Sequence, residues 1–266
     1  MAFLKWLSFT LGGMFKARGQ DRAQHLTNSF YKYIILNNLT YLLIYMERII
    51  AENLAKLLRI DITQIAREYW EILILKGLFD SPEGKHLIFK GETALRLVYG
   101  SPRFSEDLDF SLTRDRLKGR FNLLIKKIIS PFPELKLADL EEKYYTYLGE
   151  IKVTQDYLPL PFRINIEISK RQQRGYKSEL SIISSPVSTI QCLGRVATIE
   201  QLYKDKIVCL KERAKSKDVF DLWYLSQKLK RPYDPDSILI AKKELVRELR
   251  KYLTKDFWPI IDRLKR

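Results

Sequence analysis

Between Lys90 and Phe110 the chain places a glycine turn, a short helical segment and a strand with two aspartates in direct succession. The turn begins at Gly91, and the strand contains Asp107 and Asp109. Side chains two residues apart on a strand point to the same face of a sheet, so these two carboxylates project together. Like charges held this close repel each other unless a cation lies between them, so the pair is a candidate divalent metal site. Two solvated surface acids are the alternative, and the glycine turn at this distance upstream favours the metal site.

The turn before this strand has the residue types of a phosphate-binding loop. Gly91 permits close approach of the backbone, Thr93 can present its N–H and hydroxyl near a helix start, and Lys90 can add positive charge. A turn, a short helix and paired carboxylates in this order can hold the phosphates of a nucleotide beside a metal ion. The pattern therefore predicts a metal-dependent nucleotidyltransferase.

A third carboxylate lies on a second predicted strand, residues 162–170. Isoleucines alternate there with polar residues that include Asn165 and Glu167. If this strand lies beside the first, Glu167 completes a triad with Asp107 and Asp109, as a metal ligand or as the general base for an attacking hydroxyl. The alternative is one acid on the solvated face of an edge strand.

A cluster of charged residues follows in the C-terminal part of the chain. Lys206 and Arg213 could stabilise the charge that develops as pyrophosphate leaves, and Asp218 lies in an otherwise apolar segment. A solvated helix face is the alternative for the basic residues. If Ser216 caps a helix, Asp218 falls in its first turn and has a structural role.

The periodicity of apolar residues predicts an α/β (α+β) fold with a mixed sheet flanked by helices. Asp61 is a predicted helix N-cap with Gln64 three residues on, and Thr198 opens a capping box with Gln201. We expect a helical N-terminal extension (1–60), a nucleotidyltransferase core (61–197) and a helical C-terminal region that contributes to the site (198–266). Predicted strands cover 86–90, 108–112, 144–154, 162–170 and 180–186, and predicted helices cover 26–60, 61–79, 93–99, 117–129 and two or three segments after 198.

Charge constrains the partner. The chain has 47 Lys and Arg against 32 Asp and Glu, a formal net charge of +15. A polyanion, most simply a nucleic acid, is the favoured partner, and a surface basic only for solubility is the alternative. With two histidines in the whole chain, a metal must be held by carboxylate oxygens, which indicates Mg²⁺ or Mn²⁺ rather than zinc.

We expect a soluble cytoplasmic protein with no membrane partner. Cys192 and Cys209 match no metal-ligand spacing and are predicted to be free thiols. The most apolar stretch, residues 34–50, contains two asparagines, a glutamate and an arginine, and no segment reaches the roughly 18 apolar residues of a membrane span. The first 15 residues could still touch a partner or a membrane surface.

Two longer segments resemble the AbiEii/AbiGii-type toxin nucleotidyltransferases, relatives of the MenT toxins in the DNA polymerase β-like superfamily. The family's first motif runs approximately F-K-G-G-T-A-L-R-L, followed by R-F-S-E-D-[ILV]-D, and this chain has FKGETALRL at 89–97 and RFSEDLD at 103–109. The family's later E-K…R…R-D-x-x-D-L pattern is similar to Asp205-Lys206, Arg213 and the segment 217–222. The likeness spans about residues 61 to 225.

This resemblance implies that Asp107 and Asp109 bind metal, that Thr93 and Lys90 contact phosphate, and that Lys206 and Asp218 belong to the active site. It also implies a cognate antitoxin. One departure stands out, because Glu92 replaces the family's second glycine and adds a negative charge where phosphate should approach. Cys209 and Lys217 replace the usual Ala and Arg.

The leading hypothesis is transfer of a nucleotide from an NTP onto the hydroxyl of an acceptor, preferably tRNA. A second hypothesis keeps this chemistry but makes the acceptor a protein hydroxyl. A third is an inactive nucleotidyltransferase fold that binds RNA or a partner protein.

Overall fold

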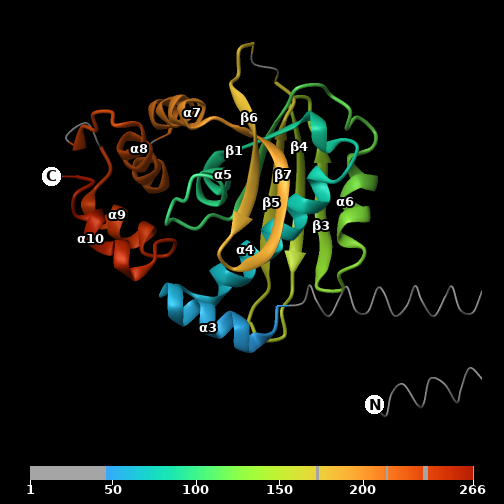
Figure 1. The fold of residues 1–266 in the computed structure, drawn as a ribbon, viewed down its shortest axis with the longest axis horizontal. Helices are drawn as coiled ribbons and strands as arrows, with labels where there is room; N and C mark the ends of the chain where they lie inside the picture. Colours follow the sequence, from blue (N-terminus) through green and yellow to red (C-terminus); the bar gives the residue numbers. More distant parts are fainter. Residues whose placement is uncertain (1–45, 172–173, 214, 236–238, 266) are drawn as a thin grey trace, which may run out of the picture. The chain divides into compact units, whose positions relative to one another are not determined.

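The computed structural model describes residues 46–265, except 172–173, 214 and 236–238. The described residues from 47 onward form one compact unit (Figure 1). The predicted helical pattern between 26 and 45 lies outside the described residues. Free thiols are confirmed for Cys192, which is buried, and Cys209, which is half-buried.

A seven-stranded mixed sheet is the centre of this unit, in the order β3-β4-β5-β2-β1-β7-β6 (Figure 1). The pairs β1/β7 and β2/β5 are parallel, and the remaining pairs are antiparallel. The predicted mixed α/β sheet is therefore confirmed. The strands are β1 (Leu87–Lys90), β2 (Asp107–Leu112), β3 (Leu135–Glu142), β4 (Thr146–Val153), β5 (Phe162–Ser169), β6 (Ser178–Ser185) and β7 (Ser188–Ala197).

The α-helices described are α3 (Arg48–Leu58), α4 (Ile62–Phe79), α5 (Gly91–Leu97), α6 (Phe121–Ile129), α7 (Ile199–Glu212), α8 (Ser216–Leu229), α9 (Lys242–Leu249) and α10 (Trp258–Ile261). Both predicted N-caps are confirmed: Asp61 accepts a hydrogen bond from the Thr63 backbone N–H, and Thr198 accepts one from Gln201. Four C-terminal helices replace the two or three predicted, and α6 begins at Phe121 rather than at 117. None of the described helices has the length and apolar character needed to cross a bilayer.

Helices α4 and α6 pack on one face of the sheet. Phe110 of β2 contacts Phe79 of α4, and the Phe121 ring of α6 lies 5.2 Å from that of Tyr147 in β4. Because side chains alternate along β2, Asp107 and Asp109 point to the opposite face. That opposite face carries the candidate site.

The C-terminal helices build a second apolar core beside the sheet. Leu202 of α7, Phe220 and Leu225 of α8 and Leu249 of α9 are buried there together with Leu95 of α5. This packing fixes α7 and α8 against α5, the helix that begins at the predicted phosphate turn. The residues that flank the site thus come from chain segments more than a hundred residues apart.

Candidate functional site

Three carboxylates from two neighbouring strands share the open face of the sheet. In the parallel β2/β5 pair, Asp109 lies opposite Glu167 and Asp107 lies opposite Asn165. The apolar residues between them, including Leu108, are buried on the other face. The prediction that the Glu167 strand lies beside the aspartate strand is confirmed, and the three acids form one cluster.

This cluster lines a cavity of about 330 Å³. Strands β3 and β4 contribute further acids, so the wall is strongly negative. The lining residues that carry a charge or an amide are Asp107, Asp109, Asp139, Glu141, Lys143, Glu150, Asn165 and Glu167. An excess of carboxylate oxygens in one cavity is the environment that hard divalent cations such as Mg²⁺ prefer.

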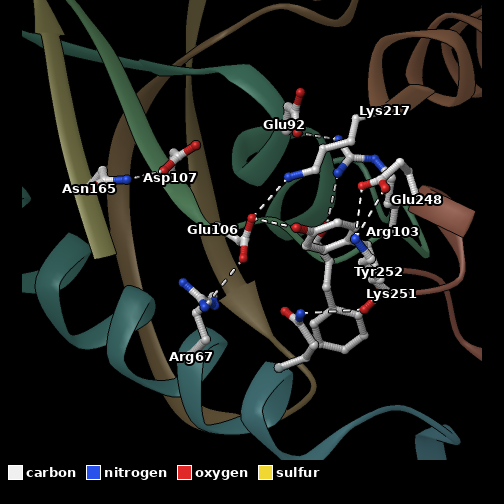
Figure 2. A network of polar contacts seen from close by, with 12 residues as sticks. Arg67, Glu92, Arg103, Glu106, Asp107, Asn165, Lys217, Glu248, Lys251 and Tyr252 are labelled. Carbon is white, nitrogen blue, oxygen red and sulfur yellow. Dashed lines mark hydrogen bonds and ion pairs between the residues drawn. The ribbon is translucent and has the colours of Figure 1, made fainter. Parts of the chain in front are cut away.

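The Asp109 carboxylate is the most perturbed acid of this cavity. Burial, and then the charge of Asp107, raise its pKa to about 7, while Lys90 opposes the shift. Asp107 is oriented by Asn165, whose side-chain amide donates a hydrogen bond of 2.8 Å to it (Figure 2). Partly buried acids that repel one another without a compensating cation fit a metal ion well.

The turn at Gly91 connects β1 to α5 directly beside Asp109. Gly91 has φ +77°, and a Cβ atom there would lie 3.0 Å from the Asp109 Cγ and closer still to a carboxylate oxygen. Lys90 is opposite Asp109 in the β1/β2 pair. Gly91 thus has a left-handed backbone conformation, and it lies so close to the Asp109 carboxylate that a side chain at this position would collide with it.

Thr93 connects the start of α5 to the start of β2. Its side chain is buried, and its hydroxyl donates a hydrogen bond to the backbone carbonyl of Asp107. The hydroxyl therefore fixes the start of β2 relative to α5. Its predicted contact with phosphate remains a prediction.

A second cluster, the ion network, consists of the five side chains Glu92, Arg103, Lys206, Asp218 and Asp221. Arg103 donates two hydrogen bonds to Asp221, of 2.8 and 2.7 Å, and lies 2.7 Å from Glu92. The Lys206 ammonium lies 2.8 Å from Asp218, 2.9 Å from Asp221 and 3.3 Å from Glu92. The three carboxylates could by themselves hold a cation, but the Lys206 ammonium already lies among them.

Electrostatics within the ion network stabilise its charged forms. Burial opposes ionisation of Lys206, but Asp221, Glu92 and Asp218 outweigh it and raise the pKa of this lysine. Burial likewise opposes the charged form of Glu92, yet Arg103 and Lys206 hold the pKa of its carboxyl well below the usual value. Lys206 and Glu92 are therefore both charged at neutral pH.

The loop between α5 and β2 is anchored to the C-terminal region. Glu106 accepts hydrogen bonds from Tyr252 (2.7 Å) and Lys217 (3.1 Å), and it lies 3.4 Å from Arg67 of α4 (Figure 2). The Phe104 backbone N–H donates to the Tyr252 carbonyl. These contacts position Asp107, the residue that follows Glu106.

Residues 73–261 match the family model described as nucleotidyl transferase AbiEii toxin of Type IV toxin–antitoxin systems. This range is well over half of the chain and contains both the carboxylate cavity and the ion network. The chain belongs to the AbiEii family. The resemblance inferred from the motifs is therefore confirmed.

No curated protein matches this AbiEii family chain. Among solved structures it is similar to JHP933 from Helicobacter pylori, with 25% identity, 63% of this chain and 68% of that chain covered, and a TM-score of 0.48. It is also similar to MenT4, a nucleotidyltransferase toxin from Mycobacterium tuberculosis, with 18% identity, 71% and 65% coverage, and a TM-score of 0.48.

The departure of this AbiEii family chain at Glu92 has a structural explanation. The added carboxylate contacts Arg103 and Lys206 inside the ion network, so both of these cations compensate its charge. Asp218 does lie in the first turn of α8, but the N-cap is Lys215, and Ser216, the expected cap, is the first residue of the helix. Arg213 is at the exposed rim, with its guanidinium 3.9 Å from Asp218.

Two clusters thus contain most of the residues predicted from sequence. Asp107, Asp109 and Glu167 meet in the cavity, and Lys206 and Asp218 meet in the ion network. Sequence reasoning assigned no role to Asn165, Arg103 or Asp221. Asn165 could have been found from strand alternation, because it shares a face with Glu167 two residues away; the contact between Arg103 and Asp221, 118 residues apart, had no local signal.

We expect Gly91→Ala to lower nucleotide transfer by about a hundredfold and to destabilise the fold by about 1–3 kcal/mol, because the new Cβ displaces the Asp109 carboxylate and strains the backbone. Gly119→Ala is the matched control, since Gly119 also has a positive φ (+66°) but open space around it. Gly119→Ala should lower the stability of the fold but leave the rate of nucleotide transfer unchanged. Steady-state rates and thermal unfolding of both variants distinguish displacement of Asp109 from backbone strain.

Proposed function

We propose that this AbiEii family protein transfers a nucleotide from an NTP, with Mg²⁺ or Mn²⁺, onto a hydroxyl of an acceptor RNA, with tRNA the preferred acceptor. The observation that carries the proposal is the meeting of Asp107, Asp109 and Glu167 in one cavity beside the Gly91 turn. The net charge of +15 supports a nucleic-acid acceptor. A cognate antitoxin is the protein partner we expect for a member of this family.

The carboxylates Asp107, Asp109 and Glu167 would hold the metal. When bound, it would polarise the α-phosphate and lower the pKa of the acceptor hydroxyl. Asn165 keeps the Asp107 carboxylate oriented, and the absence of a side chain at Gly91 lets the Asp109 carboxylate lie against the turn. Glu167 serves either as a further ligand or as the base that accepts the hydroxyl proton.

For Lys206 and Asp218 we propose a positioning role. Lys206 is buried and its ammonium contacts carboxylates of the ion network, including Glu92 in the first turn of α5. Glu92 directly follows Gly91, so the network determines where this turn lies. Arg213 and Lys90 are the cations we propose for the phosphates of the NTP: Arg213 has a largely exposed side chain, and Lys90 stands opposite Asp109.

The test is incubation of the purified protein with total tRNA, Mg²⁺ and each α-³²P-labelled NTP in turn. We expect label on tRNA with one or more of the nucleotides, and none after chelation of the metal with EDTA or in the Asp107→Ala variant. Label on a protein in a cell lysate, with none on tRNA, would instead support the protein-modifying alternative. No label in either assay, together with tight RNA binding, would favour the inactive binding module.

A further inference from the structure

Two tyrosines occupy the tip of the hairpin between β3 and β4. Glu142 pairs with Tyr147, and the Lys143 backbone N–H donates to the Thr146 carbonyl at 2.8 Å, so Tyr144 and Tyr145 are the two central residues of the turn. Their side chains are 84% and 52% exposed. The two rings meet edge to face, with centroids 4.5 Å apart.

Local folding does not account for these residue types. Two-residue hairpin turns favour Gly, Asn and Asp, because those residues accept the positive φ of the preferred turns. Tyr144 and Tyr145 both have negative φ, and neither ring enters the core. Large aromatic side chains on a short, ordered turn are typical of surfaces that bind a ligand by stacking.

Cations and hydrogen bonds surround the tip. The Lys170 backbone N–H donates to the Tyr145 carbonyl at 2.8 Å, and its ammonium donates to the Lys143 carbonyl at 2.6 Å. The Arg171 guanidinium lies 4.7 Å from the centre of the Tyr145 ring. These contacts hold the turn against the end of β5 and place the Arg171 guanidinium beside the Tyr145 ring. The Lys170 ammonium lies over the neighbouring Tyr147 ring.

The tip lies at the edge of the carboxylate cavity. Lys143, the residue before Tyr144, lines this cavity together with Asp107, Asp109 and Glu167. In the register of the sheet, Thr146 pairs with Ser169, two residues beyond Glu167 on β5. A strand of nucleic acid whose end enters the cavity can therefore pass over the tyrosines.

We propose that Tyr144 and Tyr145 form a stacking platform for unpaired bases of the acceptor RNA, with Arg171 and Lys143 beside its phosphates. Every base has a stacking face, so such a platform binds an unpaired end with little dependence on sequence. A duplex end presents no free bases to it. The platform rests on the proposed function, because it places the acceptor end at the cavity.

The test compares two fluorescein-labelled RNA hairpins, one with an unpaired 3′ overhang and one with a blunt end, by fluorescence anisotropy without NTP and at fixed salt. Stacking on two tyrosines predicts that the double variant Tyr144→Ala/Tyr145→Ala binds the overhang RNA at least about tenfold more weakly than the wild type. The double alanine variant and the wild type should bind the blunt-ended RNA with the same affinity. Tyr144→Phe/Tyr145→Phe keeps both rings and should retain overhang binding.

Leu123→Ala is the matched surface control, since Leu123 is 70% exposed on α6, away from the cavity. Thermal unfolding checks that each variant is folded. Unchanged overhang binding in the double alanine variant overturns the platform, and so does equal weakening for both RNAs. Selective loss of label transfer onto a protein acceptor overturns it too, because the turn would then contact a protein.

The platform and the proposed reaction can fail separately. If label reaches tRNA but the double alanine variant binds and labels like the wild type, the reaction stands and the platform is wrong. If no labelling occurs but only the alanine variant loses overhang binding, the platform stands and the reaction is wrong. Asp107→Ala, assayed in parallel, should lose labelling and keep overhang binding.

Discussion

Replacing Asp109 with asparagine should abolish Mg²⁺-dependent nucleotide transfer and, in the metal-free protein, raise the stability of the fold. If Asp109 holds the metal as we propose, its loss removes several kcal/mol of transition-state stabilisation, so the rate should fall by at least about a thousandfold. Burial and Asp107 raise the pKa of Asp109 to about 7, above the ordinary value of 3.8. Its ionised form therefore destabilises the native state.

The sign of the stability change follows from that pKa. Between about pH 4 and 7 the folded protein binds more protons than the unfolded chain, so stability falls as the pH rises through this window. At about pH 8 Asp109→Asn should stabilise the fold by roughly 2 kcal/mol, and at about pH 4 it should change stability little. Thermal unfolding at both pH values measures the difference.

Asp139→Asn is the matched control for the cavity. Asp139 lines the same cavity from β3 but has an exposed side chain. Its loss should leave the rate within about tenfold of wild type and leave Mg²⁺ able to raise the unfolding temperature. If the two variants had equal rates, or if Mg²⁺ stabilised the Asp109→Asn protein as much as the wild type, the metal would not be held by Asp109.

Arg103→Met should cost about 3–5 kcal/mol of unfolding free energy. The substitution leaves three buried or half-buried carboxylates, Glu92, Asp218 and Asp221, with the Lys206 ammonium as the buried cation among them and Arg213 at the exposed rim. Chemical denaturation of the variant measures the loss. Arg48→Met is the matched control, because it removes the arginine of an exposed ion pair with Glu52. It should lower the unfolding free energy by less than about 1 kcal/mol.

A second substitution in the same background tests the assignment of Glu92 to the network. Glu92→Gln removes one of the uncompensated carboxylates, so it should restore part of the stability that Arg103→Met loses. In the wild-type background the same change should destabilise, because two cations lose a partner. Additive effects of the two substitutions would show that Glu92 and Arg103 are not coupled.

Local patterns in the sequence were sufficient to predict the carboxylate cavity and the turn beside it. The side chains of Asp107 and Asp109 share a face because strands alternate, and Gly91 marks the turn because a left-handed backbone favours glycine. Glu167 joined them through the alternation of its own strand. The family motif at 103–109 supported the same location.

Other features depend on contacts that no local pattern encodes. Strand β3 (Leu135–Glu142) is largely exposed, and its apolar and polar residues do not alternate regularly along the whole strand, so it was not predicted. Strand β7 (Ser188–Ala197) was also missed, although every second residue from Cys192 onward is buried. The ion network joins Arg103 to Asp221 and Glu92 to Lys206, and only the packing of α7 and α8 against α5 brings these residues together.

The anchoring of the loop before β2 has a consequence for how small an active fragment can be. Arg103 contacts α8 through Asp221, and Phe104 and Glu106 contact Tyr252 just after α9. A truncated chain that kept the entire sheet but ended after β7 would retain all three cavity carboxylates and lose every one of these anchors. We therefore expect a fragment without the C-terminal helices to lose activity even though it keeps the three carboxylates.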